Sequence, residues 1–334
     1  MKKLVAIVAG GDSSEMEVSL KSAAGIMGFI DKGRYEAYVV IIMRSGWYVE
    51  LQSGAKAAID KNDFSFRDGD AVRRFDFAYI TIHGTPGEDG RLQGYFDMIG
   101  MPYSSCGTLA SAISFNKFVC NSFLRNFGIR VPYSALIRKG NNINTRELVE
   151  RIGLPLFIKP CCGGSSFGVT KVNSESQMEE AISKAFSEGD ELIAEQNVSG
   201  TEVTCGCYNA GKQTLVFPVT EVVSKNEIFD FNAKYKGESE EITPARIPSY
   251  TADEVQRITA HIYELLGAKG LIRIDYIINN IGLPIMLDVN TTPGMTPTSF
   301  IPQQVAAADE SMTEILTDII ENELTSYEYR SDTI

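Results

Sequence analysis

The chain contains 334 residues with a formal net charge of −12, and 44% of the residues are hydrophobic. These values are typical of a globular protein with room for two or three domains. No long basic run is present, which argues against nucleic acid as a partner, and no apolar run approaches the ~18 residues of a membrane-spanning helix. Phosphate binding by so acidic a chain would depend on single, well-placed Lys and Arg residues.

The N-terminus, MKKLVAIVAGG, begins as a signal peptide does, with basic residues before apolar ones. Its apolar run covers only Leu4 to Ala9, which is short of the ~7–15 residues of a signal peptide. We interpret it as a first strand and expect a cytoplasmic protein. The six cysteines include no C-x-x-C pair, so buried, reduced thiols are expected.

Residues 1–116 alternate between strand and helix patterns. The expected strands are Leu4–Ala9, Ala37–Met43, Phe77–Ile82 and Met101–Ser104, and the expected helices are Ser14–Phe29 and a segment opening at Asp89–Gly94. Alternation of this kind predicts a small open α/β sheet that binds ligands at the carboxyl ends of its strands. The loop His83–Gly90 lies at such an end, so His83 is a candidate ligand-binding residue. The other histidine, His261, lies in an amphipathic helix and is interpreted as structural.

Residues 117–204 predict a compact two-layer α+β unit. Its expected elements are the helices Lys117–Phe127, Thr145–Ile152 and Ser176–Phe186 and the strands Leu156–Lys159, Val169–Val172 and Leu192–Gln196. The loop Gly163–Gly168 follows Lys159, and its glycines would let backbone N–H groups approach phosphate oxygens. Lys159 could contact the same phosphate. The residue order is not that of a Walker A motif, and a flexible turn explains the loop equally well.

Residues 205–334 end in an acidic hairpin. The expected elements are the strands Thr204–Asn209, Leu215–Glu221 and Leu271–Ile278, a strand near residue 288, and the helices Ala252–Leu266 and Met312–Leu324. The turn Asn279–Gly282 would join the last two strands. Asp275, Asp288 and Asn290 could then converge as oxygen ligands for Mg2+. Two surface carboxylates flanking a hairpin are the alternative.

Three further acids are candidates with ordinary explanations. Glu195 and Glu202 could accept hydrogen bonds from ribose hydroxyls or an adenine amino group, although solvated glutamates are commoner. Glu15 could bind an ammonium group if it points into a cleft. Ser13 or Ser14 could equally cap the following helix, with the acid favoured in its first turn.

Six segments now occur together and in order. They are GGDSSEMEVSL at 10–20, HGTPGEDGRLQG at 83–94, KPCCGGSSFGV at 159–169, EQNVSGTEVT at 195–204, FDFNAKY at 229–235, and GLIRIDY followed by LDVNTTPGMTPTSFIP. The chain resembles the D-alanine–D-alanine ligases of the ATP-grasp superfamily over essentially its whole length.

The resemblance implies an ATP-grasp fold that combines α/β and α+β parts in three domains, at 1–116, 117–204 and 205–334. ATP would lie between the second and third domains. It would phosphorylate the carboxylate of one D-alanine, and the amine of a second D-alanine would attack the acyl phosphate. The product would be the dipeptide used in peptidoglycan. Two Mg2+ ions, for which Mn2+ can substitute, and a homodimer are also implied.

The family's pattern also implies residue roles. Residues that would contact the nucleotide are Lys117, Lys159, Glu195, Val198, Glu202 and Lys234. Metal ligands would be Asp275, Asp288 and Asn290. The D-alanine molecules would be held by Glu15, His83, Arg273 and Ser299. Catalytic positions would be Glu15, Ser165, Tyr235, Arg273 and Gly294, with Ser165 and Tyr235 linking Glu15 to a lid over about 225–244.

One departure and three alternatives remain. The family usually has Glu where this chain has Asp288, and we expect a backbone shift or a bound water to compensate for the shorter side chain. A ligase making D-alanyl-D-lactate is the nearest alternative, and Tyr235 argues against it. The others are a non-catalytic nucleotide-binding protein and an ATP-grasp enzyme for another acid, such as a carboxylase.

Overall fold

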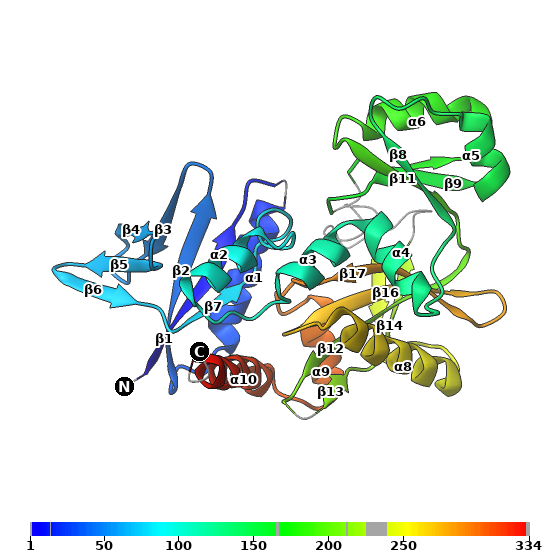
Figure 1. Cartoon of the computed structure of the whole chain (residues 1–334). Helices are drawn as coiled ribbons and strands as arrows, with labels where there is room; N and C mark the ends of the chain where they lie inside the picture. Colours follow the sequence, from blue (N-terminus) through cyan, green and yellow to red (C-terminus); the bar gives the residue numbers. More distant parts are fainter. Residues whose placement is uncertain (1, 14, 165–166, 212, 225–238, 332–334) are drawn as a thin grey trace.

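The computed structural model describes residues 2–13, 15–164, 167–211, 213–224 and 239–331. Three β-sheets follow one another along the chain, and helices cover them (Figure 1). The largely parallel centre of the first sheet and the antiparallel second and third sheets agree with the expected combination of α/β and α+β parts.

The first sheet has seven strands in the order β6-β5-β4-β3-β2-β1-β7. Its strands are β1 (Lys3–Gly10), β2 (Tyr35–Met43), β3 (Gly46–Glu50), β4 (Lys56–Asp60), β5 (Ser65–Asp68), β6 (Ala71–Arg74) and β7 (Phe77–Ile80). Strands β2, β1 and β7 are parallel, and β1 is almost wholly buried, as expected for a parallel strand covered on both faces. The loops after β1 and β7 therefore leave the same edge of the sheet.

Helices α1 (Met16–Phe29) and α2 (Arg91–Ile99) belong to this sheet. Two expectations differ from the structure. The antiparallel strands β3 to β6 were not anticipated, and the expected strand Met101–Ser104 is reduced to one bridge between Ala78 and Tyr103.

The second sheet has the order β10-β9-β11-β8. Its strands are β8 (Ser134–Arg138), β9 (Leu156–Pro160), β10 (Thr170–Val172) and β11 (Glu191–Gln196). Helices α5 (Thr145–Ile152) and α6 (Met178–Ala185), the latter preceded by a 3-10 turn at Glu175–Gln177, share a hydrophobic core with it. This part forms a separate lobe at the upper right of Figure 1.

The third sheet has the order β15-β14-β12-β16-β17, with β13 paired to β12. Its strands are β12 (Gly200–Asn209), β13 (Thr214–Val216), β14 (Thr220–Ser224), β15 (Ser239–Ile242), β16 (Ile272–Asn279) and β17 (Pro284–Asn290). The predicted single strand Leu215–Glu221 is wrong, because β13 and β14 are separate. Helix α8 (Ser249–Leu266) shares a core with one face of this sheet.

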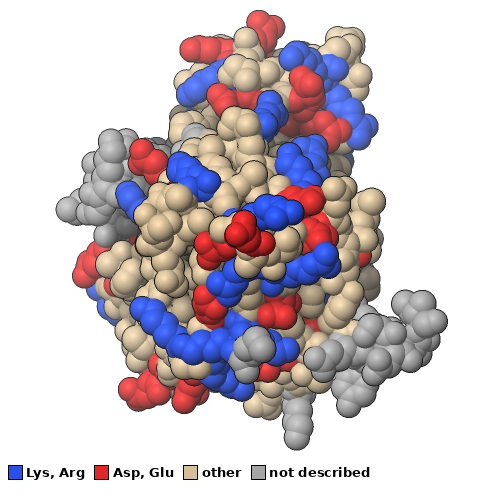
Figure 2. All heavy atoms as spheres, turned by 90° about the vertical axis from the view of Figure 1, so that its left-hand side faces the viewer, with Lys and Arg blue, Asp and Glu red and all other residues tan. Residues whose placement is uncertain are grey.

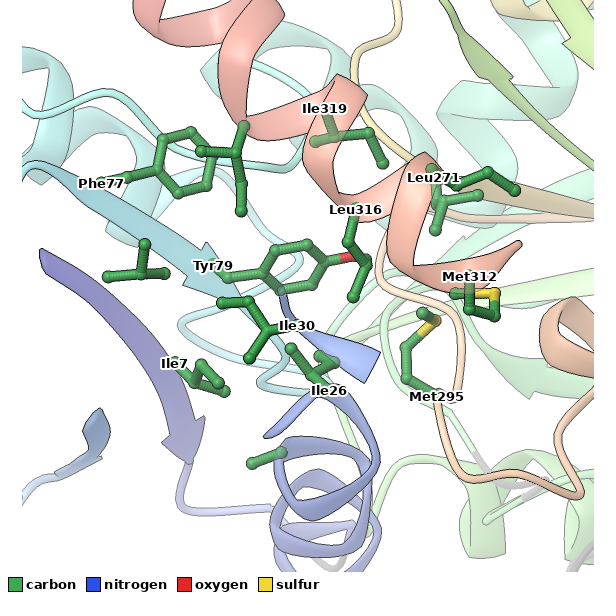
Figure 3. Close-up of a cluster of buried hydrophobic side chains, with 14 of the residues drawn as sticks. Ile7, Ile26, Ile30, Phe77, Tyr79, Leu271, Met295, Met312, Leu316 and Ile319 are labelled. Atoms are coloured by element: carbon green, nitrogen blue, oxygen red, sulfur yellow. The ribbon is translucent and has the colours of Figure 1, made fainter. Parts of the chain in front are cut away.

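Helices α3 (Thr108–Phe115) and α4 (Lys117–Asn126) connect the first sheet to the second. Helix α9 (Phe300–Ala307) follows β17, and α10 (Met312–Ser331) ends the described chain. Helix α10 returns to the first sheet, where Leu316 and Ile319 pack with Ile7, Phe77 and other buried side chains (Figure 3).

Met295 from the loop after β17 joins this same core (Figure 3). A Cβ at Gly25 of α1 would lie 2.0 Å from the carbonyl oxygen of Met295, so only glycine allows this approach. The loop after β17 is therefore held against α1, and residues from the two ends of the chain meet.

The surface viewed in Figure 2 carries Lys and Arg interspersed with Asp and Glu. All six cysteines are free thiols, and only Cys162 is exposed. Within the described ranges, no helix is both long and apolar enough to cross a bilayer.

Candidate active site

Two adjoining cavities lie where the three sheets meet. One, of about 560 Å³, is bounded by β9, the loop after it and the face of β16 and β17. The other, of about 820 Å³, extends between α1 and the loop after β17. Glu15, Lys117 and Asp288 line both cavities, so the predicted nucleotide and substrate residues share one continuous crevice.

A buried ion pair lies on the wall formed by the second sheet. Lys159 Nζ donates to Glu195 Oε1 at 2.6 Å, and Asn121 Nδ2 donates to Glu195 Oε2 at 3.1 Å. The Glu195 side chain is only 5% exposed. A carboxylate so buried is tolerated because both of its oxygens are hydrogen-bonded and one is paired with a cation.

The same cavity has a partly apolar end. Val198 lies in the connection between β11 and β12, and Glu202 lies on β12. Phe157, Ile277 and Leu287 line this end as well. Apolar side chains beside a few polar groups are typical of a site for a small molecule or a cofactor.

The acidic hairpin brings its carboxylates together. Asp275 on β16 lies opposite Asp288 on β17, and the residues of β16 that alternate with Asp275 are buried. Asn290 Nδ2 donates to Asp275 Oδ2 at 3.1 Å, and Thr204 Oγ1 donates to Asp275 Oδ1 at 2.6 Å. Arg273 forms two further hydrogen bonds to Asp275, at 2.9 and 3.0 Å.

Lys117 contacts the hairpin from α4. Its Nζ donates to Asp288 Oδ2 at 2.9 Å, and Asn116 caps the helix by accepting a hydrogen bond from Val119 N at 3.1 Å. Burial alone would lower the pKa of Lys117, but the charge of Asp288 and other acids raises it above its ordinary value. Lys117 is therefore a permanently charged group across a wide pH range.

The donor set fits divalent metal binding. Two facing carboxylates repel each other unless a cation lies between or beside them, and here Arg273 and Lys117 supply that charge. Two carboxylates and an amide are the hard oxygen donors that Mg2+ prefers. In the part of the chain described, no cluster of three or more His, Cys, Asp or Glu side chains forms a metal site.

Strand β17 contains a β-bulge beside Asp288, the position at which this chain departs from the family pattern. Asp275 pairs with Asp288, but Tyr276 pairs with Met286, so Leu287 is an extra residue in β17. A bulge of this kind changes the direction of neighbouring side chains. The expected backbone shift at Asp288 stays a prediction, and this bulge lies beside it.

Glu15 and His83 line the larger cavity, and each is only 8% exposed. Ser22 Oγ lies 3.5 Å from His83 Nε2. Burial lowers the pKa of His83 to about 4, the nearby Glu15 charge opposes this shift, and the Arg273 charge adds to it. The imidazole is therefore neutral at physiological pH and offers one N–H donor and one acceptor.

The prediction that Ser13 could cap α1 is wrong. Its Oγ donates to the carbonyl of His83 at 3.1 Å and accepts from Glu15 N at 3.2 Å. The N-cap position of α1 is Glu15, with no side-chain cap hydrogen bond. Ser14 lies outside the described residues. Ser13 therefore joins the loop after β1 to the loop after β7.

Sequence analysis missed Glu88 as an individual residue. Its Oε2 accepts a hydrogen bond from Gly84 N at 2.7 Å, and it lines the larger cavity. Burial raises the pKa of Glu88 to about 7. The negative charge of Glu15 also raises this pKa, and the positive charge of Lys117 lowers it. Nothing in the sequence distinguishes Glu88 from the neighbouring Asp89, because only the fold turns one of them toward the cavity.

Gly294 and Ser299 lie together in the loop after β17. Ser299 Oγ accepts from Thr296 N at 3.1 Å and lies 3.0 Å from the place that a Cβ of Gly294 would occupy. Both line the larger cavity with Arg273. Three predicted site residues, Ser165, Lys234 and Tyr235, lie outside the described residues.

Family models match nearly the whole chain. Residues 4–106 match the model described as the D-ala D-ala ligase N-terminus, and residues 123–321 match the D-ala D-ala ligase C-terminus. These ranges contain every described candidate residue except Lys117, which lies between them.

Individual relatives match this chain over nearly its full length, and the similarity to solved ligase structures confirms the expected ATP-grasp fold. A D-alanine–D-alanine ligase of Parabacteroides distasonis is 60% identical over 324 residues, which are 97% of this chain and 98% of that protein. The crystal structure of VanG D-Ala:D-Ser ligase from Enterococcus faecalis has a TM-score of 0.87 at 30% identity, covering 97% of this chain and 100% of that one. The Bacillus anthracis D-alanine–D-alanine ligase complexed with ATP has a TM-score of 0.79 at 25% identity, covering 98% and 99%.

Proposed function

Because the chain belongs to the D-alanine–D-alanine ligase family, we propose that it joins two D-alanine molecules, with cleavage of ATP to ADP and phosphate, to make D-alanyl-D-alanine for peptidoglycan. The observation that carries this proposal is the contact at 2.9 Å between Lys117 and Asp288. It brings the start of the central region and the acidic hairpin to one crevice, as a shared triphosphate site requires.

The reaction needs an activated acid and a protected intermediate. A carboxylate is a poor electrophile, and transfer of the γ-phosphoryl group from ATP converts it to an acyl phosphate with a good leaving group. The ammonium group of the second D-alanine loses a proton, the resulting amine attacks the acyl carbon, and the tetrahedral intermediate collapses with release of phosphate. Since the transferring phosphoryl carries dispersed negative charge, the protein mainly positions and neutralises it.

The nucleotide would occupy the smaller cavity. We assign Lys117 and Lys159 to the phosphates, since both are cations at its wall. The apolar end with Val198 would receive adenine, and Glu195 and Glu202 would accept hydrogen bonds from its amino group and from the ribose. Lys234 is carried over from the family motif as a further contact to the γ-phosphate.

Mg2+, or Mn2+ in its place, would be held by Asp275, Asp288 and Asn290. When bound, two such ions would supply positive charge that neutralises and orients the phosphates. The chain's own part is to keep the carboxylates ionised and aligned. Arg273 and Thr204 orient Asp275 by hydrogen bonds, and Lys117 balances the charge of Asp288.

The first D-alanine would bind between Glu15 and His83 in the larger cavity. The Glu15 carboxylate would receive the ammonium group, and the neutral His83 would donate one N–H to the carboxylate. Arg273 and the backbone N–H of Gly294 would stabilise the oxyanion that forms at the reacting carbon. Ser299 would hold the carboxylate of the second D-alanine by its hydroxyl.

Ser165 and Tyr235 take their roles from the family motif alone. They would connect Glu15 to the segment at about 225–244, which would exclude water from the acyl phosphate. The three-domain division at 1–116, 117–204 and 205–334 is supported by the three sheets, although β12 begins at Gly200 and favours a slightly earlier second boundary. A cytoplasmic homodimer is also part of the proposal.

Product analysis tests the function directly. The purified protein is incubated with ATP, Mg2+ and D-alanine, and both phosphate and dipeptide are measured, with Arg273→Ala as a control. Equal amounts of phosphate and D-alanyl-D-alanine are expected. Preferential formation of D-alanyl-D-lactate when D-lactate is added would instead favour the depsipeptide ligase, and the absence of any ligation product would favour a nucleotide-binding protein.

A further inference from the structure

Glu241 lies on the active-site face of the third sheet. It pairs with Val222 of β14, which in turn pairs with Glu202 of β12. Residues opposite each other in a sheet point to the same face, so Glu241 shares the face of Glu202. Arg273 points to this face as well, because it pairs with Gly206, an even number of residues beyond Glu202.

The side chain of Glu241 is held in place by α9. Gln303 Nε2 donates to Glu241 Oε2 at 2.5 Å and also to the carbonyl of Thr298 at 2.7 Å. Glu241 therefore lines the larger cavity together with Ser299 and Phe300. These are the surroundings assigned above to the second D-alanine.

The carboxylate introduces a negative charge where that substrate binds. Among the described residues, Gln303 provides its only hydrogen bond. Burial raises the pKa of Glu241, while the hydrogen bond from Gln303 and the charge of Arg273 lower it. Arg273 is itself paired with Asp275, so Glu241 forms no ion pair with any of the residues that the structure describes.

We propose that Glu241 is a specificity-determining residue that receives the ammonium group of the second amino acid and so selects an amine over a hydroxyl nucleophile. This inference rests on the proposed function. A zwitterion would be oriented by the charge, with its ammonium group toward Glu241 and its carboxylate toward the Ser299 hydroxyl. A hydroxy acid carries no positive group, and its carboxylate is repelled without any compensating attraction.

Competition between D-alanine and D-lactate tests the proposal. Glu241→Gln keeps the size of the side chain and removes its charge. The ratio of D-alanyl-D-alanine to D-alanyl-D-lactate, measured with excess D-lactate, is expected to fall at least about tenfold, because one charge a few ångströms away contributes at least that factor. The KM of the second D-alanine should rise, and those of ATP and the first D-alanine should stay unchanged.

Glu240→Gln is the matched control. Glu240 precedes Glu241 on β15 and is exposed, so it points to the opposite face and its loss should leave the ratio unchanged. Glu241→Asp keeps the negative charge but moves it further from the substrate, because the side chain is one methylene shorter. A smaller fall in the product ratio is therefore expected. If Glu241→Gln does not fold, the product ratio of Glu241→Asp tests the proposal in its place.

Three results would overturn the inference. They are an unchanged product ratio in Glu241→Gln, an equal fall in Glu240→Gln, and a Glu241→Asp variant whose ratio is unchanged or falls as far as that of Glu241→Gln. Failure of the wild-type protein to make any dipeptide would refute the proposed function instead, so the two failures are distinguishable.

Discussion

His83 should stay uncharged from neutral pH down to about pH 5. Its pKa falls from the ordinary value of 6.5 to about 4, chiefly because the ring is buried. This depression corresponds to roughly 3 kcal/mol of preference for the neutral form. The unfolded chain binds this proton at higher pH than the native protein does. The contribution of His83 to stability is therefore present above pH 6.5 and is lost as the pH falls toward 4.

Unfolding experiments would not isolate this effect. The raised pKa of Glu88, about 7, works in the opposite direction, because the native state then holds a proton that the unfolded chain releases. Its contribution is full at low pH and is lost as the pH rises through 7. The two groups titrate over overlapping ranges, so a direct observation of the imidazole is required.

NMR titration of the ring protons provides that observation. The chain has only two histidines, and His261→Gln leaves His83 as the single imidazole signal. The His83 chemical shift should remain constant from pH 8 to pH 5.5. Glu15→Gln removes a charge that raises the pKa of His83, so the midpoint should move further down. A midpoint near 6.5, or an upward move in Glu15→Gln, would refute the reasoning and the neutral donor assigned to the first D-alanine.

Three further changes test other parts of the site. Arg273→Ala should lower kcat/KM for dipeptide formation by an amount that corresponds to about 3 kcal/mol of lost transition-state stabilisation, the usual loss for an oxyanion donor. A fall in kcat/KM of less than tenfold in coupled phosphate-release assays would contradict this role. Lys159→Met leaves Glu195 buried without a cation and should destabilise the protein by about 3 kcal/mol in urea unfolding. Adding Glu195→Gln should recover part of that loss, and no recovery would contradict the pairing. Asp288→Asn should weaken Mn2+ binding in the presence of ADP by roughly tenfold or more, as measured by electron paramagnetic resonance, whereas Asp288→Glu should retain it; equal binding by all three proteins would remove Asp288 from the metal site.

Several elements could be predicted because their causes are local. The hairpin of β16 and β17 follows from alternating apolar residues and the turn Asn279–Gly282. Uninterrupted alternation would place Leu287 opposite Asp275, so the extra residue in β17 is what brings Asp288 to the face of Asp275. The helix Thr145–Ile152 has the bounds that its pattern predicts. The strands β3 to β6 were missed because several of them are short and largely exposed, and without a buried face a strand lacks the alternation on which prediction depends.

Residue types and spacing by themselves indicated the family of this chain, because the residues proposed to bind phosphate, metal and ammonium groups lie in segments that occur in the order of one enzyme family. Only the tertiary structure decided which of these groups meet. The contact of Lys117 with Asp288 joins residues 171 positions apart, and the turning of Glu88 and Glu241 into the larger cavity depends on loop geometry and strand register. Local sequence preferences act over a few residues, whereas contacts at this separation exist only after the sheets have packed together.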